Sequence, residues 1–139
     1  MERCVLVPYE FSNEANFALN HAYEIAKYEK LPIHLLYVAD SDKMIDEWRE
    51  ELEKVAERFV KETGYEKVKT VVKKGSAFDV IHEYGIEQNA YLAVMGVHGI
   101  KTIEKQVKLI QKFEKVPFVL VQSPLAFGEY DRLGADGYT

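Results

Sequence analysis

Two stretches far apart in the sequence carry the residues best suited to contact a ligand. The first, Pro8-Tyr9-Glu10-Phe11-Ser12, follows a short apolar run, and the second is Met95-Gly96-Val97-His98-Gly99. Gly96 and Gly99 permit a tight turn that brings backbone N–H groups close to a bound group, as an anion or nucleotide site requires. Glu10 adds a carboxylate that accepts hydrogen bonds. These residue types predict recognition of a small polar ligand.

Catalysis is not predicted at these stretches. General acid–base chemistry normally uses two titratable groups within reach of each other, and Glu10 is the only carboxylate expected at this site. The four histidines, at positions 21, 34, 82 and 98, lack the spacing of a metal site, such as a helical pair four residues apart. His98 lies inside the glycine turn, where it either faces a ligand or shapes the loop. We therefore predict no catalytic residues, no metal site and no required cofactor.

Composition restricts the class of protein further. The 139 residues carry 18 basic and 23 acidic side chains, a net charge of -5, which disfavours nucleic acid and anionic membrane surfaces as partners. The single cysteine, Cys4, lies in an apolar run and is expected to be a buried hydrophobic residue. The N-terminus does not resemble a signal peptide, and no run of eighteen apolar residues follows it. A cytoplasmic location is predicted.

The chain alternates between short apolar runs and amphipathic segments. Strands are expected at 4–8, 32–39, 67–72, 91–95 and 116–122. Helices are expected over 13–29, 44–63 and from Gly75-Ser76 onward, and a fourth is marked by Ile103, Val107, Ile110 and Phe113. Ser12 is the expected N-cap of the first helix, and Gly64 the C-cap glycine of the second. Residues 1–123 are predicted to form the domain and 124–139 a tail with little regular structure.

Five strands alternating with four helices predict an α/β domain with a parallel sheet covered on both faces, a three-layer sandwich. In such sheets ligands bind outside the carboxyl ends of the strands, where the winding order reverses. If the first and fourth strands are central neighbours, the Pro8 to Ser12 and Gly96 to Gly99 turns meet at that point.

Several segments together resemble the universal stress protein family. They are Val5 to Ser12 with the alanine-rich helix after it, His34 to Val38, the Gly75 opening before Val80-Ile81, Met95 to Gly99, and Val116 to Val121. The resemblance implies a flavodoxin-like sheet of order 3-2-1-4-5. It also implies homodimers formed through the last strand, here Pro117, Phe118, Val119, Leu120 and Val121. One branch of the family binds ATP or AMP, which makes such a nucleotide the expected ligand.

The nucleotide-binding branch has a glycine, two residues, a second glycine, nine residues, and then glycine followed by serine or threonine. This sequence keeps Gly96 and Gly99 but has Leu109-Ile110 where the second half is expected. Glu10 also stands where that branch usually has aspartate. Lys101, Lys105 and Lys108 either replace part of the lost phosphate contacts or form a solvated helix face balanced by Glu104 and Glu114.

The resulting prediction is a non-catalytic, universal-stress-type protein that senses a small ligand or adenine nucleotide, ATP or AMP. The alternative is a dimerisation and interaction module of the same fold without a nucleotide. The expected ligand contacts are Pro8, Tyr9, Glu10, Val38, Ala39, Met95, Gly96, His98, Gly99 and Lys101. The adenine base is placed near Val38 and Ala39, the ribose near Glu10 and Gly96, and the phosphates near Gly99 and Lys101.

Overall fold

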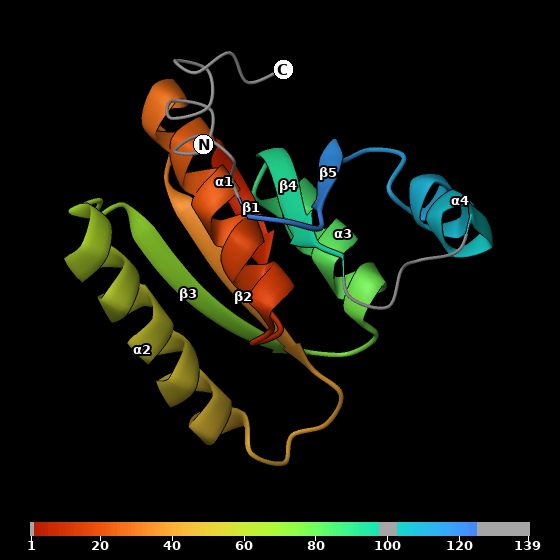
Figure 1. Cartoon of the computed structure of the whole chain (residues 1–139). Helices are drawn as coiled ribbons and strands as arrows, with labels where there is room; N and C mark the ends of the chain where they lie inside the picture. The colour runs from red at the N-terminus through yellow and green to blue at the C-terminus, as the bar shows by residue number, and fades with distance from the viewer. Residues whose placement is uncertain (1, 98–102, 125–139) are drawn as a thin grey trace.

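The computed structural model describes residues 2–97 and 103–124 and shows five strands alternating with four helices (Figure 1). The strands are β1 (Cys4–Pro8), β2 (Ile33–Ala39), β3 (Val68–Lys74), β4 (Ala90–Gly96) and β5 (Phe118–Val121). The helices are α1 (Asn13–Glu29), α2 (Ile45–Thr63), α3 (Ala77–Glu87) and α4 (Ile103–Lys112).

All strands pair in parallel in the order β3-β2-β1-β4-β5, which confirms the predicted winding. Val5 lies opposite Ile33 of β2 and Leu92 of β4, so β1 is the centre of the sheet. The chain winds outward from β1 to β3 and then returns to β4 on the other side. The switch point is therefore between β1 and β4.

Side chains of the central strands alternate between two apolar layers, as the pleat of a strand requires. Val5, Val7 and Leu35 join the layer shared with α1 and α2, while Cys4 and Leu6 join the layer that contains residues of α3 and α4. Both layers are closed to water because helices cover each face. This arrangement confirms the predicted three-layer sandwich.

Helix α1 lies close to the sheet because its inward face is made of small residues. Ala15, Ala18, Ala22 and Ala26 are all completely buried, and the helix contacts both β1 and β4. Its start is fixed by Ser12, whose hydroxyl accepts a hydrogen bond from the Ala15 N–H at 3.0 Å, as an N-cap does. The first turn of α1 is thereby held at the carboxyl edge of the sheet.

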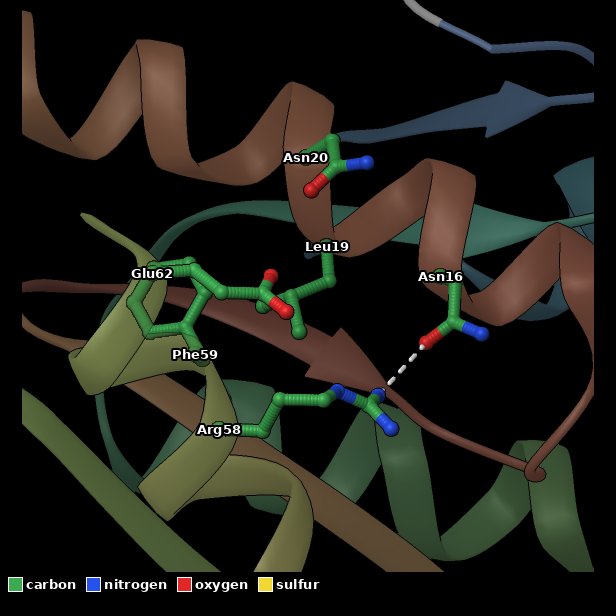
Figure 2. A pocket seen from close by; sticks show the side chains of 6 residues that line it. All are labelled: Asn16, Leu19, Asn20, Arg58, Phe59 and Glu62. Carbon is green, nitrogen blue, oxygen red and sulfur yellow. Dashed lines mark hydrogen bonds between the residues drawn. The ribbon is translucent and has the colours of Figure 1, made fainter.

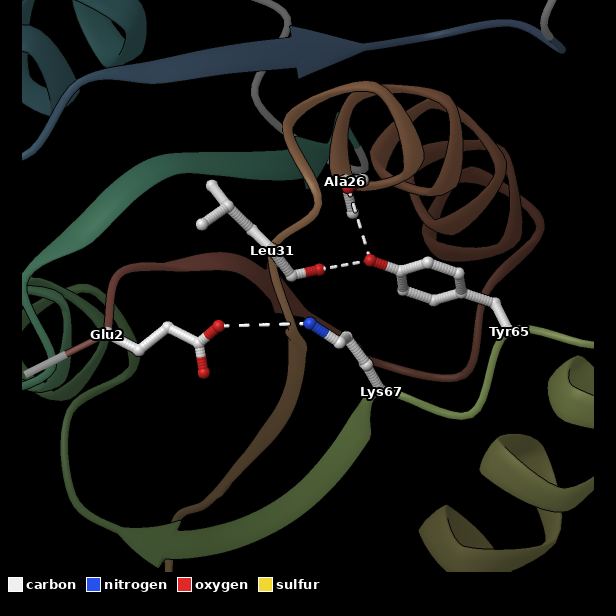
Figure 3. Close-up of polar contacts among 5 residues, drawn as sticks. All are labelled: Glu2, Ala26, Leu31, Tyr65 and Lys67. Atoms are coloured by element: carbon white, nitrogen blue, oxygen red, sulfur yellow. Dashed lines mark hydrogen bonds and ion pairs between the residues drawn. The ribbon is translucent and has the colours of Figure 1, made fainter.

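Helix α2 and the segment after it contact α1 near both ends of α1. Arg58 of α2 donates a hydrogen bond to Oδ1 of Asn16 at 3.4 Å (Figure 2). Beyond the C-cap Gly64, the Tyr65 hydroxyl donates to the carbonyl oxygens of Ala26 and Leu31 at the end of α1 (Figure 3). The second contact holds the end of α1 against the segment that enters β3.

The two outer strands differ in how they meet solvent. β3 carries lysines along an exposed border, as predicted, and Lys74 pairs with Asp42 at 3.1 Å. β5 has an exposed Val119 and no lysine. Its apolar edge is therefore open among the described residues.

Helix α4 buries a different face from the one its apolar spacing indicated. Phe113, just beyond the helix, is buried as expected, but Leu109 supplies the other inward contact. Val107 and Ile110 are 45% and 60% exposed because they lie on the side of the helix turned away from the core. The predicted helix is present, but Val107 and Ile110, two of the apolar residues that marked it, do not belong to the core.

Some predictions fall on residues that the structure does not describe. They are the placements of His98, Gly99 and Lys101 and, beyond residue 124, the tail. In the described ranges, no helix is both long and apolar enough to span a membrane.

Candidate functional site

The carboxyl ends of β1, β2 and β4 lie along one edge of the sheet. β1 ends at Pro8, β2 at Ala39 and β4 at Gly96, and the three strands are parallel neighbours. The Pro8 to Ser12 turn therefore meets the end of β4 at the switch point. This is the juxtaposition that the sequence predicts.

A hollow of about 60 Å³ opens at this edge, between the end of β1, the end of β2 and the first turns of α3. We call it the edge cleft. Its lining residues are Pro8, Tyr9, Glu10, Leu36, Tyr37, Val38, Ala77 and Ile81. Four of the sequence-predicted ligand residues, Pro8, Tyr9, Glu10 and Val38, are thus brought together.

Glu10 is exposed and is oriented by the residue that caps α1. The Ser12 hydroxyl donates a hydrogen bond to Oε1 of Glu10 at 3.0 Å and accepts one from Ala15. The carboxylate therefore lies beside the N-terminus of α1, where the helix dipole favours negative charge. A carboxylate held in this way is available to accept hydrogen bonds from hydroxyl or amine groups of a ligand.

The end of β2 contributes backbone groups. β1 pairs with β2 only as far as Pro8 and Leu36, whereas β3 accompanies β2 to Ala39. The Leu36 carbonyl accepts from Tyr9 on the β1 side, and the Ala39 carbonyl accepts from Gly75 on the β3 side. Along a strand, the N–H and C=O groups of successive residues point alternately to one neighbouring strand and to the other. The N–H and C=O of Val38 therefore point to the β1 side, past the last residue of β1 that pairs with β2. Val38 therefore presents a donor and an acceptor toward the cleft, whereas the Ala39 carbonyl is already bonded.

Gly96 is enclosed by helix α1. A Cβ atom built on Gly96 would come 2.5 Å from the carbonyl carbon and oxygen of Glu14 and 2.7 Å from the Ala15 nitrogen. The absence of a side chain at residue 96 is thus required for α1 to pack on β4. Met95, the predicted contact just before Gly96, is 3% exposed and packs in the α3 layer together with Leu36 and Ile81, but it is not among the residues that line the cleft.

Sequence reasoning missed the contribution of α3. Ala77 and Ile81 line the edge cleft, one turn apart at the start of the helix. Gly75-Ser76 directly follows β3 and begins this helix, which is the sequence signal that the helix starts at the same edge of the sheet. The apolar spacing of the helix indicated only its buried residues, so a contribution to the cleft was not predicted. Ser76 is the N-cap of this helix, but its side chain makes no capping hydrogen bond.

An aromatic cluster supports the Pro8 to Ser12 turn from the other side. Phe11 lies between Tyr9, Tyr37 and Trp48, with ring centroids 5.0, 5.4 and 5.1 Å away. Its backbone has a positive φ of 62°, a left-handed conformation that is uncommon for a bulky residue. Packing of the ring therefore holds the turn in a conformation that its local sequence does not favour.

The buried polar groups lie away from this edge. Nδ1 of His34 and the Tyr84 hydroxyl are joined by a hydrogen bond of 2.8 Å inside the α3 layer. Burial lowers the pKa of His34, raises the pKa of Tyr84 to about 12 and raises the pKa of the Cys4 thiol to about 11. These groups are neutral at physiological pH and have a structural role. Nowhere in the described ranges do three histidine, cysteine or carboxylate side chains gather as metal ligands would.

The model of the universal stress protein family matches residues 1–110 of the chain. The chain belongs to the universal stress protein family. The fold and the winding order described above are thereby placed in a known structural family. By sequence, none of the curated proteins matches the chain.

Solved universal stress proteins share this fold at low sequence identity. The protein from Lactobacillus plantarum is 22% identical, with a TM-score of 0.63, over 87% of this chain and 98% of that one. One solved in complex with cAMP is 19% identical, with a TM-score of 0.69, over 87% of this chain and 97% of that one. One from Archaeoglobus fulgidus, in complex with dAMP, is also 19% identical, with a TM-score of 0.62, over 88% of this chain and 98% of that one.

The family's glycine motif is only partly within the described residues. Gly96 is placed, whereas Gly99 and Lys101 are not. Leu109, at the position of the motif's second half, is buried under the sheet. Lys108 pairs with Glu104 at 3.3 Å, which favours the solvated helix face over a phosphate contact for that lysine. The loss of the second half of the motif stays a prediction.

Proposed function

We propose that this universal stress protein is a non-catalytic sensor that binds an adenine nucleotide in the edge cleft. The observation that carries the proposal is the convergence of Glu10, the Val38 backbone and Ala77 around one hollow at the carboxyl edge of the sheet, beside the switch point between β1 and β4. In parallel α/β sheets this is the place where ligands bind.

The backbone of Val38 suits the adenine ring. Adenine offers an amino donor and a ring-nitrogen acceptor side by side on one edge. The backbone N–H and C=O of Val38, which lie beyond the Pro8–Leu36 strand pair, complement that edge of adenine without any side chain. The neighbouring apolar surfaces of Ile81 and Leu36 suit the flat faces of a base.

Glu10 is proposed to bind the ribose. Its carboxylate is acceptor-only when ionised, and the ribose hydroxyls are donors. The hydrogen bond from Ser12 limits its motion, which compensates in part for the extra methylene relative to aspartate. The expected ribose contact with Gly96 is then made by its backbone, because no side chain fits there.

The phosphates are proposed to lie near Gly99 and Lys101. This segment precedes α4, which begins at Ile103, and the N-terminus of a helix favours anions. Without the second half of the glycine motif, each further phosphate gains few contacts. We therefore expect AMP and ATP to bind with similar affinities.

A sensing role follows from what lines the cleft. Glu10 is the only carboxylate among the described residues that line the cleft. The ribose contact proposed for it keeps its carboxylate away from the phosphates. The cAMP and dAMP complexes of proteins with the same fold support an adenine nucleotide as the ligand.

The proposed partner is a second copy of the chain, joined through β5. This strand lies at the border of the sheet, with Val119 exposed and Phe118 and Leu120 half-buried. Antiparallel pairing of two such strands satisfies their edge N–H and C=O groups and covers the apolar side chains.

Calorimetry with AMP, ATP and cAMP tests the proposal. Ala77 is an exposed residue on the cleft wall, so Ala77→Trp fills the cleft at little cost to folding. We expect saturable binding to the natural chain, loss of at least tenfold in affinity in Ala77→Trp, and unchanged binding in the control Lys61→Trp on α2. Equal binding by both variants would refute the edge cleft as the site.

The size of the hollow favours one alternative, an interaction module without a nucleotide. About 60 Å³ is below the roughly 300–1,000 Å³ of typical small-molecule sites. An intact dimer that binds none of the three nucleotides would favour this alternative. Hydrolysis of ATP above background, abolished in Glu10→Ala, would contradict both functions.

A further inference from the structure

A second hollow, of about 190 Å³, lies between α1 and α2, and we call it the helix-pair pocket. Figure 2 shows its six lining residues, three from each helix: Asn16, Leu19, Asn20, Arg58, Phe59 and Glu62. Leu19 and Phe59 are buried and form an apolar floor. The other four side chains form a polar rim. The nucleotide proposal uses none of these side chains.

The charges on the rim are separated. Arg58 and Glu62 are four residues apart on α2, a spacing at which opposite charges usually lie close enough to pair. Here Figure 2 shows the guanidinium turned toward Asn16 and the carboxylate lying over Leu19. In the described ranges, neither forms an ion pair, and the one hydrogen bond of Arg58 is the 3.4 Å contact with Asn16. A cation and an anion therefore flank the hollow and leave it open.

The position of Arg58 is fixed by a short chain of contacts. Oδ1 of Asn16 accepts from Arg58 and also from the Tyr9 hydroxyl at 2.5 Å. Tyr9 is 4% exposed and packs in the core, so it anchors Asn16, which in turn holds the guanidinium. Most of the donors of Arg58 remain available to a ligand.

We propose that the helix-pair pocket binds a small zwitterion of the α-amino-acid type with a short apolar side chain. The carboxylate of the ligand pairs with Arg58 and the ammonium group with Glu62, while the apolar side chain lies on Leu19 and Phe59. The pocket volume lies below that of drug-sized sites, which limits the ligand to a few heavy atoms.

Three matched probes test this proposal: L-valine, isovalerate, which lacks the ammonium group, and isobutylamine, which lacks the carboxylate. Calorimetry gives the affinities, and NMR follows the side-chain amides of Asn16 and Asn20. We expect L-valine to bind roughly tenfold more tightly than either singly charged probe, because it pairs with both rim charges. The shifts should be confined to α1 and α2.

Two charge-neutralising variants then give opposite results. Arg58→Gln should weaken L-valine and isovalerate by about tenfold and leave isobutylamine unchanged. Glu62→Gln should weaken L-valine and isobutylamine but strengthen isovalerate, because the repulsion of its carboxylate is removed. Arg49→Gln and Glu51→Gln, exposed on the same helix, are the controls and should change nothing.

All four positions are exposed, and unfolding midpoints confirm that each variant is folded. The proposal is overturned if L-valine shifts no amide of the pocket at millimolar concentration. It is equally overturned if Arg58→Gln and Arg49→Gln bind L-valine alike, or if Glu62→Gln does not shift the ratio of the two affinities toward isovalerate and away from isobutylamine.

Discussion

Gly96, at the end of β4, lies directly against the peptide unit of Glu14 in the first turn of α1. A methyl group at residue 96 would approach the Glu14 carbonyl to 2.5 Å, a distance that requires the helix or the strand to move. The glycine at the carboxyl edge of the sheet thus sets the distance between helix and sheet. A substitution at Gly96 is therefore expected to lower the stability of the fold, whether or not a ligand is bound.

Replacing Gly96 with alanine is therefore expected to destabilise the domain by roughly 3 kcal/mol, the cost of overpacking a rigid site. The control is Gly64→Ala, where φ is positive but no atom lies within 4 Å of the added methyl group. Its cost should be only about 1 to 2 kcal/mol, from the left-handed backbone alone. Urea unfolding of both variants measures the difference, and equal costs would contradict the packing of α1 described above.

Tyr84→Phe removes the hydroxyl that meets Nδ1 of His34 and leaves a buried imidazole nitrogen without its partner. The expected loss of stability is about 1–3 kcal/mol. Tyr91→Phe is the matched control, because the Tyr91 hydroxyl contacts the exposed carboxylate of Glu29. Its loss should be near zero, and a comparable loss in both variants would argue against a buried role for Tyr84.

Stability should fall in mildly acidic solution because of His34. Burial lowers its pKa in the folded state below the ordinary value of 6.5, so the unfolded chain binds the proton more readily. The contribution is fully present above pH 6.5 and declines as the pH falls through the folded-state pKa. Unfolding midpoints across this range should decline more steeply for the natural chain than for His34→Gln. Parallel profiles would contradict this assignment.

Val119→Lys should convert the proposed dimer into a monomer, because a lysine on the exposed edge of β5 disfavours strand pairing. Analytical ultracentrifugation distinguishes the two states. Ile86→Lys, at an exposed apolar position on α3, is the control and should leave the dimer intact. Dissociation in the control but not in Val119→Lys would place the interface elsewhere.

Much of the fold could be predicted because local signals and the global pattern agree. Ser12 and Gly64 marked helix ends by cap chemistry, and the apolar runs of β1 and β4 indicated strands buried on both faces. Right-handed crossovers then left few winding orders. α4 shows the limit of this reasoning. Its apolar residues cover a wide face of the helix, and their spacing does not reveal that Leu109 faces the core whereas Val107 and Ile110 face away from it.

The candidate site was predicted less completely. Loops after adjacent parallel strands meet by geometry, so the Pro8 to Ser12 turn could be paired with the end of β4 from the sequence, whereas Val38 was expected at the site only from the family resemblance. The contributions of Ala77 and the left-handed Phe11 depend on how α3 and the aromatic cluster pack, which spacing does not encode. The separation of Arg58 from Glu62 likewise arises from a contact with another helix.

The most direct test of the nucleotide proposal is NMR mapping of AMP on the uniformly labelled chain. Binding in the edge cleft should give saturable shifts of the Glu10, Val38 and Ala77 amides, with contacts from the adenine protons to Val38. Saturable shifts that instead lie on α2 or β3, or no shifts at millimolar AMP, would contradict it.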